Sequence, residues 1–319
     1  MSYETFMFNG KEFKIDKYLA NALVTLVYNV KNDWDFVILI SGNREVRIGK
    51  SVLAMTVSAY IGYCLAKMKL NNNAFNVDNI FFDHKDMLKK SMEKPKYSVI
   101  LYDEAREGLA SQRASTAFQQ DLIQFFNECG QLNHIYILVL ADFFDMREVM
   151  AVGRSELLIN CYKREVNRKI WFGEETRNVV FYDRGFFQFF NKRAKNLLYD
   201  FYRTTSRKNY SMVKTSFPVG CFENQYPVDE KQYRKLKEDA LIRFRTAEEK
   251  AIEKKKPENK PLSPRYERIS DQRNTVFRYL EKNKILTKKK ICEITNMSLP
   301  AVSGIISGSN SRPKDLGIA

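Results

Sequence analysis

The chain of 319 residues, 44% of them apolar, is long enough to form a large core and to contain two domains. Its formal net charge of +15 is unevenly spread, because residues 1–160 hold 18 Lys+Arg and 19 Asp+Glu while the rest hold 35 and 19. A polyanion would therefore bind mainly to the second half. A solvated basic surface without a partner is the alternative.

The five cysteines are widely scattered and lack the spacing of metal ligands, which argues against structural zinc and indicates a reducing compartment. With only two histidines, His84 and His134, a histidine-based catalytic site is disfavoured. The first residues lack the apolar run of a signal peptide, and no stretch reaches transmembrane length. We therefore expect a cytoplasmic protein that does not insert into membranes.

Residues 13–30 form the first predicted element. Apolar side chains recur there at helical spacing, and Asp16 is available as an N-cap near the start. We expect this helix to pack beside the first strand of a sheet.

The segment DFVILISGNREVRIGKSVLAM, residues 35–55, has the order of a phosphate-binding P-loop. Residues 35–40 predict a buried strand, Gly49-Lys50-Ser51 closes the following loop, and a helix over residues 50–69 comes next. Six residues separate Gly42 from Gly49, whereas the usual motif has about four. The loop is therefore longer or built differently, and a chance Gly-Lys-Ser at a helix start is the alternative.

Each part of such a loop has a chemical role. Backbone N–H groups and the positive end of the helix dipole bind the α- and β-phosphates of ATP, Lys50 neutralises β/γ-oxygens, and the Ser51 hydroxyl ligates Mg²⁺. The predicted nucleotide-binding residues are Gly42, Asn43, Arg44, Ile48, Gly49, Lys50, Ser51 and Val52.

A second acidic motif follows a short strand at residues 79–82 and a helix at residues 84–93. The segment YSVILYDEA, residues 97–105, predicts a strand that ends at Asp103 and Glu104. If this strand lies directly beside the P-loop strand, Asp103 reaches the Mg²⁺ shell near Ser51, and Glu104 can act as the general base. An acidic turn is the alternative.

The remaining elements of this half alternate. Residues 115–130 predict a helix, and residues 134–141 and 156–161 predict buried strands. This alternation indicates an α/β fold with a mostly parallel sheet covered on both faces. Asp142, at a strand end, is either a sensor of the γ-phosphate or a plain loop acid.

After the P-loop come four segments, YDEAREGLASQR, ILVLADFFDMRE, VGRSELLINCYKR and FYDRGFFQFFNKRAKNLLY. Their order over residues 35–202 resembles the RecA-type ATPases of mobile elements related to zonula occludens toxin-like proteins, a group placed beside the FtsK/HerA DNA translocases. The resemblance implies a RecA-like P-loop NTPase that forms a homo-oligomeric ring and moves or packages DNA, in host cytoplasm or with a virion. The elongated P-loop departs from the common pattern.

Ring ATPases complete each site with an arginine from the next subunit, because charge on the γ-phosphoryl group requires a second cation. Arg113, after the acidic strand, and Arg154, before the strand at residues 156–161, are the candidates. A surface arginine is the alternative for either. With Lys50 and Glu104 they complete the predicted catalytic set.

Residues 164–202 mix aromatic and basic side chains. Residues 169–172, 179–182 and 186–190 predict short strands or hairpins, with a turn at residues 183–185. The aromatic side chains could stack on bases, although core aromatics beneath a solvated basic face are an equal alternative. The predicted phosphate contacts are Arg184, Lys192, Arg193 and Lys195.

Composition divides the chain into three parts. Residues 1–205 form the ATPase domain with its hairpin region, residues 206–263 an extended arm and a charged linker helix, and residues 264–319 a small all-α domain. Predicted helices at residues 270–283, 287–295 and 298–307 resemble a helix-turn-helix, with Thr287 and Ser298 as N-caps.

The last of these helices, LPAVSGIIS, carries no side chain suited to reading base edges. We therefore expect phosphate contacts through Lys288, Lys289 and Lys290, and a protein-docking module is the alternative. Two functions follow for the whole chain. The first is an ATP-hydrolysing DNA motor, and the second is an ATP-switched DNA-binding regulator or loader that is not a motor.

Overall fold

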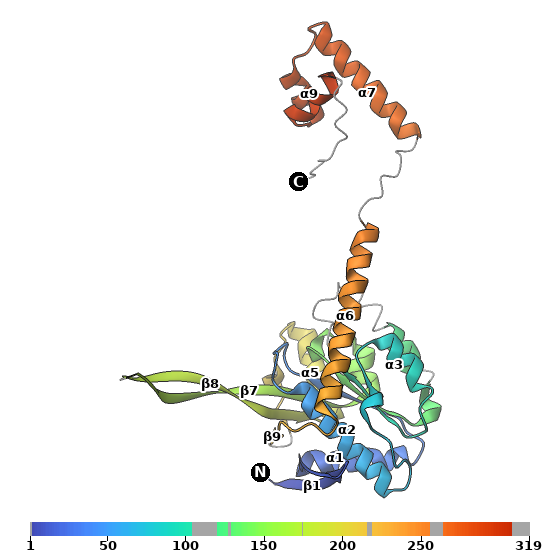
Figure 1. Ribbon diagram of the computed structural model, residues 1–319, viewed down its shortest axis with the longest axis vertical. Helices are drawn as coiled ribbons and strands as arrows, with labels where there is room; N and C mark the ends of the chain where they lie inside the picture. The colour runs from blue at the N-terminus through green and yellow to red at the C-terminus, as the bar shows by residue number, and fades with distance from the viewer. Residues whose placement is uncertain are drawn as a thin grey trace. The chain divides into compact units, whose positions relative to one another are not determined.

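A computed structural model describes residues 2–103, 120–126, 129–173, 175–215, 219–255 and 264–307. The chain forms two compact units, Met1–Thr246 and Ala247–Ala319. The first unit holds a sheet covered by helices, and the second is helical (Figure 1). None of the helices in these described ranges has an apolar stretch long enough to span a bilayer.

The first unit begins with an antiparallel hairpin of β1 (Tyr3–Phe8) and β2 (Lys11–Asp16). Asn9 and Gly10 form its turn, and both have positive φ, as a two-residue turn between twisted strands requires. The prediction of a helix from residue 13 is therefore wrong at its start, because pairing with β1 keeps this segment extended.

Helix α1 (Lys17–Val30) starts where the Asp16 carboxylate accepts hydrogen bonds from the backbone N–H groups of Tyr18 and Leu19. This confirms the predicted N-cap, which satisfies two donors that a helix start leaves unpaired.

The main sheet has seven strands in the order β4-β5-β6-β3-β7-β8-β9. The first five run parallel, and β8 is antiparallel to both of its neighbours. This confirms the predicted mostly parallel α/β sheet. The strands are β3 (Phe36–Ser41), β4 (Ile80–Phe81), β5 (Val99–Asp103), β6 (Ile135–Val139), β7 (Ser155–Phe172), β8 (Glu175–Phe190) and β9 (Gly220–Cys221).

Strand β6 lies between β3, which precedes the Gly49-Lys50-Ser51 loop, and β5, which ends at Asp103. Ile137 of β6 pairs with Ile38 on one side and with Leu101 on the other. The expectation that β3 and β5 are direct neighbours is therefore wrong. Their carboxyl ends nevertheless lie at the same edge, because all three strands run in the same direction.

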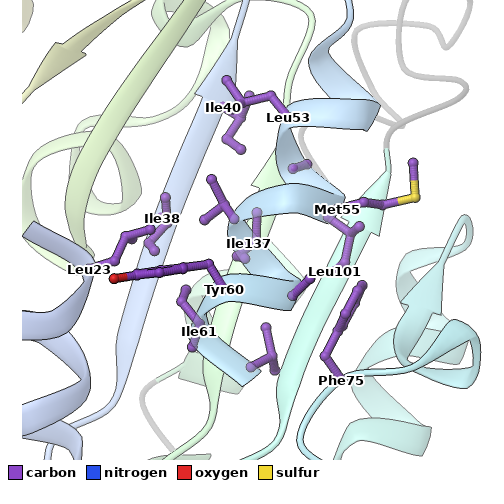
Figure 2. Packing of buried hydrophobic residues seen from close by; sticks show 14 of the residues in the cluster. Leu23, Ile38, Ile40, Leu53, Met55, Tyr60, Ile61, Phe75, Leu101 and Ile137 are labelled. Atoms are coloured by element: carbon purple, nitrogen blue, oxygen red, sulfur yellow. The ribbon is translucent and has the colours of Figure 1, made fainter. Parts of the chain in front are cut away.

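Each face of the sheet has its own core. On one face, Ile38 and Ile40 pack with Leu23 of α1 and with Leu53 and Tyr60 of α2 (Lys50–Lys67) (Figure 2). The alternate residues of β3, Val37 and Leu39, pack on the opposite face with Phe126, Leu198 and Tyr199. This period of two explains why the central strands are unbroken apolar runs.

The helices of the first unit include α2 (Lys50–Lys67), α3 (His84–Ser91) and α5 (Lys192–Thr205), and residues 120–126 are also helical. The predicted helices at residues 50–69 and 84–93 are confirmed. Short 3₁₀ turns lie at Val77–Asn79, Cys129–Leu132, Phe143–Asp145 and Tyr210–Met212, and a π-helical turn lies at Val149–Arg154.

Strands β7 and β8 continue beyond the sheet as a long two-stranded ribbon (Figure 1). The predicted short strands are thus parts of one hairpin, which reverses direction after Phe172. Residues 183–185 lie inside β8, next to a register shift between Tyr162 and Arg164, so the turn predicted there is wrong. The side chains at the outer end of the ribbon are exposed, and Trp171 is 77% accessible.

Helix α6 (Glu230–Lys255) starts in the first unit. The second unit contains α7 (Pro264–Lys282), α8 (Lys288–Thr295) and α9 (Leu299–Ser307), around Phe277, Ile291 and Val302. Thr287 caps α8 by accepting a hydrogen bond from the Lys290 N–H, as predicted.

Candidate nucleotide-binding site

The elongated loop between β3 and α2 folds back on itself. Ile48 is 1% exposed, and a Cβ at Gly42 would lie 2.2 Å from its Cδ1 atom and 3.0 Å from Cδ of Lys50. Any side chain at position 42 would therefore displace Ile48 or the start of α2. The additional residues are accommodated by a compact loop in which Ile48 packs on the first glycine.

Four residues of this loop have positive φ, namely Asn43, Arg44, Arg47 and Gly49. The Arg44 N–H donates to the Ala141 carbonyl at 2.8 Å, and the Arg44 guanidinium donates to Asp145 Oδ1 at 2.8 Å. Both contacts attach the loop to the segment that follows β6. The Arg44 backbone N–H and one nitrogen of its guanidinium are therefore engaged within the protein.

Asp145 also accepts a hydrogen bond from Lys208. Burial acts to raise the pKa of Asp145, but the hydrogen bonds from Lys208 and Arg44 outweigh it and hold the pKa below its usual value. Asp145 is therefore a negatively charged anchor for the loop at neutral pH.

The first turn of α2 and the end of β5 meet at the carboxyl edge of the sheet. Ser51 Oγ donates to Asp103 Oδ1 at 3.0 Å, so the two predicted metal ligands are brought together. Lys50 Nζ donates to the Glu45 carbonyl at 3.1 Å. The first N–H groups of a helix lack intrahelical acceptors, so α2 presents its positive end at the same place.

These residues fit a magnesium ion that is shared with a nucleotide. Ser51 and Asp103 supply two oxygen donors, and Mg²⁺ in such sites usually takes one or two protein oxygens with water and phosphate. Within the described ranges, no three His, Cys, Asp or Glu residues cluster as a metal site.

Two residues of α6 complete the surroundings of Asp103. Tyr233 donates its hydroxyl to Asp103 Oδ2 at 2.5 Å, and Lys237 Nζ donates to the same oxygen at 2.8 Å. Tyr233 is 3% exposed and packs against the rings of Phe82 and Tyr226. Burial and the charge of Asp103 both raise the pKa of Tyr233, so its hydroxyl stays protonated and remains a donor.

Sequence reasoning missed Tyr233 and Lys237, because it assigned this segment to an arm and a charged linker helix. A signal was present: Tyr233, Leu236 and Ala240 recur at helical spacing, and all three pack against the core of the first unit. A solvated linker has no such apolar stripe.

Asp142 lies near the same edge, after β6, and is 3% exposed. The Tyr210 hydroxyl donates to Asp142 Oδ1 at 2.9 Å and accepts from the Phe143 N–H at 3.0 Å. Because the single hydroxyl proton of Tyr210 is used for Asp142, the 3.0 Å contact with Ser41 Oγ is donated by Ser41. Asp142 is thus connected through Tyr210 to Ser41 at the end of β3, and its role as a sensor stays a prediction.

Arg154 precedes β7 and so lies at the amino edge of the sheet, opposite the loop between β3 and α2. Its guanidinium donates to Asp35 Oδ2 at 2.5 Å and to the Phe126 carbonyl at 2.6 Å. A role at a neighbouring subunit stays a prediction. Glu104 and Arg113 lie outside the described residues.

The predicted DNA contacts are dispersed over several elements. Arg184 of β8 donates to the Arg47 carbonyl of the loop between β3 and α2 at 3.0 Å, Lys192 pairs with Glu156, and Arg193 is exposed. Lys195 was expected to grip phosphates, but it is fully buried. Its ammonium donates to the Ala151 and Val152 carbonyls, and burial lowers its pKa to about 8, so a DNA contact is wrong for this residue.

The ribbon arranges cations over aromatic rings. Arg164 lies 4.1 Å from the ring centroid of Phe186 and Lys163 4.3 Å from that of Tyr182, while Arg177 lies 4.9 Å from that of Phe172.

In the second unit, Lys288 pairs with Glu281 at 3.6 Å and Lys290 pairs with Glu293 at 2.8 Å. Lys289 is exposed beside them.

Comparison of the chain with protein-family models, with curated proteins and with solved structures finds no match.

Proposed function

We propose that this protein is an ATP-hydrolysing P-loop NTPase with a RecA-like core. One observation carries the proposal: Ser51, the residue after Lys50 at the positive end of α2, donates a hydrogen bond to the acid that ends β5. A strand-loop-helix and an acidic strand end are the two parts that phosphate and metal binding need at one sheet edge.

In this proposal the loop and the first turn of α2 bind the phosphates. Lys50 exchanges the Glu45 carbonyl for a phosphate oxygen, and Ser51 and Asp103 hold Mg²⁺, which neutralises phosphate charge when bound. Glu104, the residue after Asp103, orients and deprotonates the attacking water as general base.

We further propose that the hydrolysis drives a DNA motor that packages, transfers or translocates DNA as a homo-oligomeric ring. The basic second half of the sequence supports a polyanion partner. Arg113 or Arg154 would complete the site of a neighbouring subunit. A switched regulator or loader is the second candidate, favoured by the helix-turn-helix-like order of α7, α8 and α9.

Two substitutions separate phosphate binding from chemistry. Lys50→Ala should weaken ATP binding, because a cation on the β/γ-oxygens is lost. Glu104→Gln should retain binding and lower turnover by roughly 10²-fold or more, because only the base is lost. Nucleotide binding is measured with a fluorescent ATP analogue and turnover by phosphate release.

Lys67→Ala is the matched control, since Lys67 is an exposed lysine at the other end of α2. It should leave both quantities near their wild-type values. An equal loss of ATP binding in Lys50→Ala and Glu104→Gln would contradict the assigned roles.

A further inference from the structure

We propose that Lys237 of α6 supplies at Asp103 the positive charge that the metal would bring, so that Mg²⁺ and the Lys237 ammonium compete for the Asp103 carboxylate. Tyr233 is a positioning residue that holds this carboxylate in both states. The inference rests on the proposed nucleotide site and identifies what the binding of its metal must displace.

Both oxygens of Asp103 are engaged. Oδ1 accepts from Ser51, and Oδ2 accepts from Tyr233 at 2.5 Å and from Lys237 at 2.8 Å. The Asp103 side chain is 2% exposed, so solvent contributes little to its charge balance. A buried carboxylate needs a nearby cation, and the Lys237 ammonium supplies it.

A magnesium ion at Asp103 would make that ammonium unfavourable. Two cations at one carboxylate repel each other, and water cannot screen them well at a buried oxygen. The divalent ion has twice the charge of the ammonium, and a bound nucleotide adds phosphate ligands that Lys237 does not have. The metal therefore replaces Lys237 rather than joining it.

The two α6 side chains differ in their freedom to leave. The Lys237 side chain is 31% exposed, so its flexible stem can carry the ammonium into water. Tyr233 is 3% exposed and held between Phe82 and Tyr226. A neutral hydroxyl donor also tolerates the metal, because it carries no charge. Lys237 is thus the exchangeable group and Tyr233 the fixed one.

The experiment measures how much Mg²⁺ the full-length protein needs to bind a fluorescent ATP analogue. In Lys237→Met the competing charge is removed while an unbranched apolar stem is kept. The Mg²⁺ concentration for half-maximal binding should fall by about tenfold, as expected when one charge of a close pair is lost. Lys237→Arg keeps a cation and should stay within about twofold of wild type.

Lys235→Met is the matched control, because Lys235 is an exposed lysine on the same helix. It should leave the Mg²⁺ midpoint within about twofold of wild type. A Lys237→Met midpoint equal to that of Lys235→Met, with binding intact, would overturn the competition but leave the proposed function standing. Absence of Mg²⁺-dependent ATP binding in the wild type would overturn the proposed function itself.

Hydrogen exchange of the wild type tests the same idea without a substitution. ATP with Mg²⁺ should speed exchange of the amides in residues 231–240 relative to ATP with a chelator, because an anchor of α6 is released. Equal exchange in the two conditions, with ATP bound in both, would overturn the competition even if Lys237→Met does not fold.

Discussion

At Gly42 the loop leaves no room for one additional methyl group. We predict that Gly42→Ala lowers the free energy of unfolding by roughly 1–3 kcal/mol, the usual range for overpacking, because Ile48 and Lys50 must move. It should also weaken ATP binding through the displaced loop. Urea unfolding followed by circular dichroism, together with the binding assay, measures both effects.

Gly153→Ala is the control for this substitution, because a Cβ at Gly153 would meet nothing within 4 Å. We expect a change of about 0.5 kcal/mol or less at that surface position. If the two alanine variants were equally stable, the packing of Ile48 on Gly42 would not be what requires a glycine.

The two hydrogen bonds of the buried His134 ring require that only one of its nitrogens carry a proton. The Ser98 N–H donates to its Nδ1 atom at 3.2 Å, so Nε2 carries the proton and donates to the Ser91 carbonyl at 3.0 Å. Burial lowers the pKa of His134 below 6.5, so the ring stays neutral in the folded protein. An added proton would remove the acceptor for Ser98.

We therefore predict an acid-sensitive stability. The unfolded chain takes up the proton near pH 6.5 and the folded chain only at lower pH, so the free energy of unfolding falls as pH drops below about 6.5. His134→Gln should flatten this dependence between pH 7 and 5. Parallel pH profiles for wild type and His134→Gln would refute the assignment.

At the scale of elements, unbroken apolar runs predicted β3, β5 and β6 because a strand buried on both faces needs apolar residues at every position. Other elements were missed for identifiable reasons. The Asn9-Gly10 turn signal lies between alternating residues that belong to a half-buried hairpin. Asp183-Arg184-Gly185 reads as a turn locally, but continuous pairing with β7 overrides it.

The second unit leads to a prediction about how DNA affinity depends on salt concentration. Replacing Lys288, Lys289 and Lys290 together by alanine should lower DNA affinity alike for unrelated duplexes and flatten the salt slope by at most about three units. Lys288 is paired with Glu281 and Lys290 with Glu293, so phosphates must compete with two carboxylates. The change in salt slope should therefore be smaller than this upper limit. Binding of the full-length protein is measured by fluorescence anisotropy at several salt concentrations.

The controls are Lys282→Ala, Lys284→Ala and the double variant, because both lysines are exposed and precede α8. A triple variant that loses affinity for one sequence only would instead favour the regulator function. No loss for any duplex would make this unit a candidate for protein docking.

At the scale of the whole molecule, sequence alone does not give the order of the strands. Ser51 and Asp103 were correctly expected to meet, but the reasoning placed their strands side by side, whereas β6 separates them. An apolar run indicates that a strand is buried but not which strands lie beside it. The position of β6 in the sheet depends on packing between segments far apart in the chain. The start of α6 is a different case, because the helical spacing of Tyr233, Leu236 and Ala240 is a local signal that this segment packs on the first unit.

The two candidate functions differ in how they depend on DNA length. A motor repeats its cycle along the polymer, so we predict that ATP turnover by the full-length protein rises with DNA length at a constant concentration of ends. A switch would stay slow at every length. Phosphate release with duplexes of increasing length decides between them, with Lys50→Ala as the inactive control.

The exposure of Trp171 on the ribbon also determines what tryptophan fluorescence can report about the protein. The chain has two tryptophans, and the other, Trp34, is 60% exposed. Both indoles are in contact with water in the folded state, so their emission should already be red-shifted and change little on unfolding. Because Trp171 lies on the ribbon, its emission should change when a polyanion covers the hairpin, and Trp34→Phe would isolate that signal.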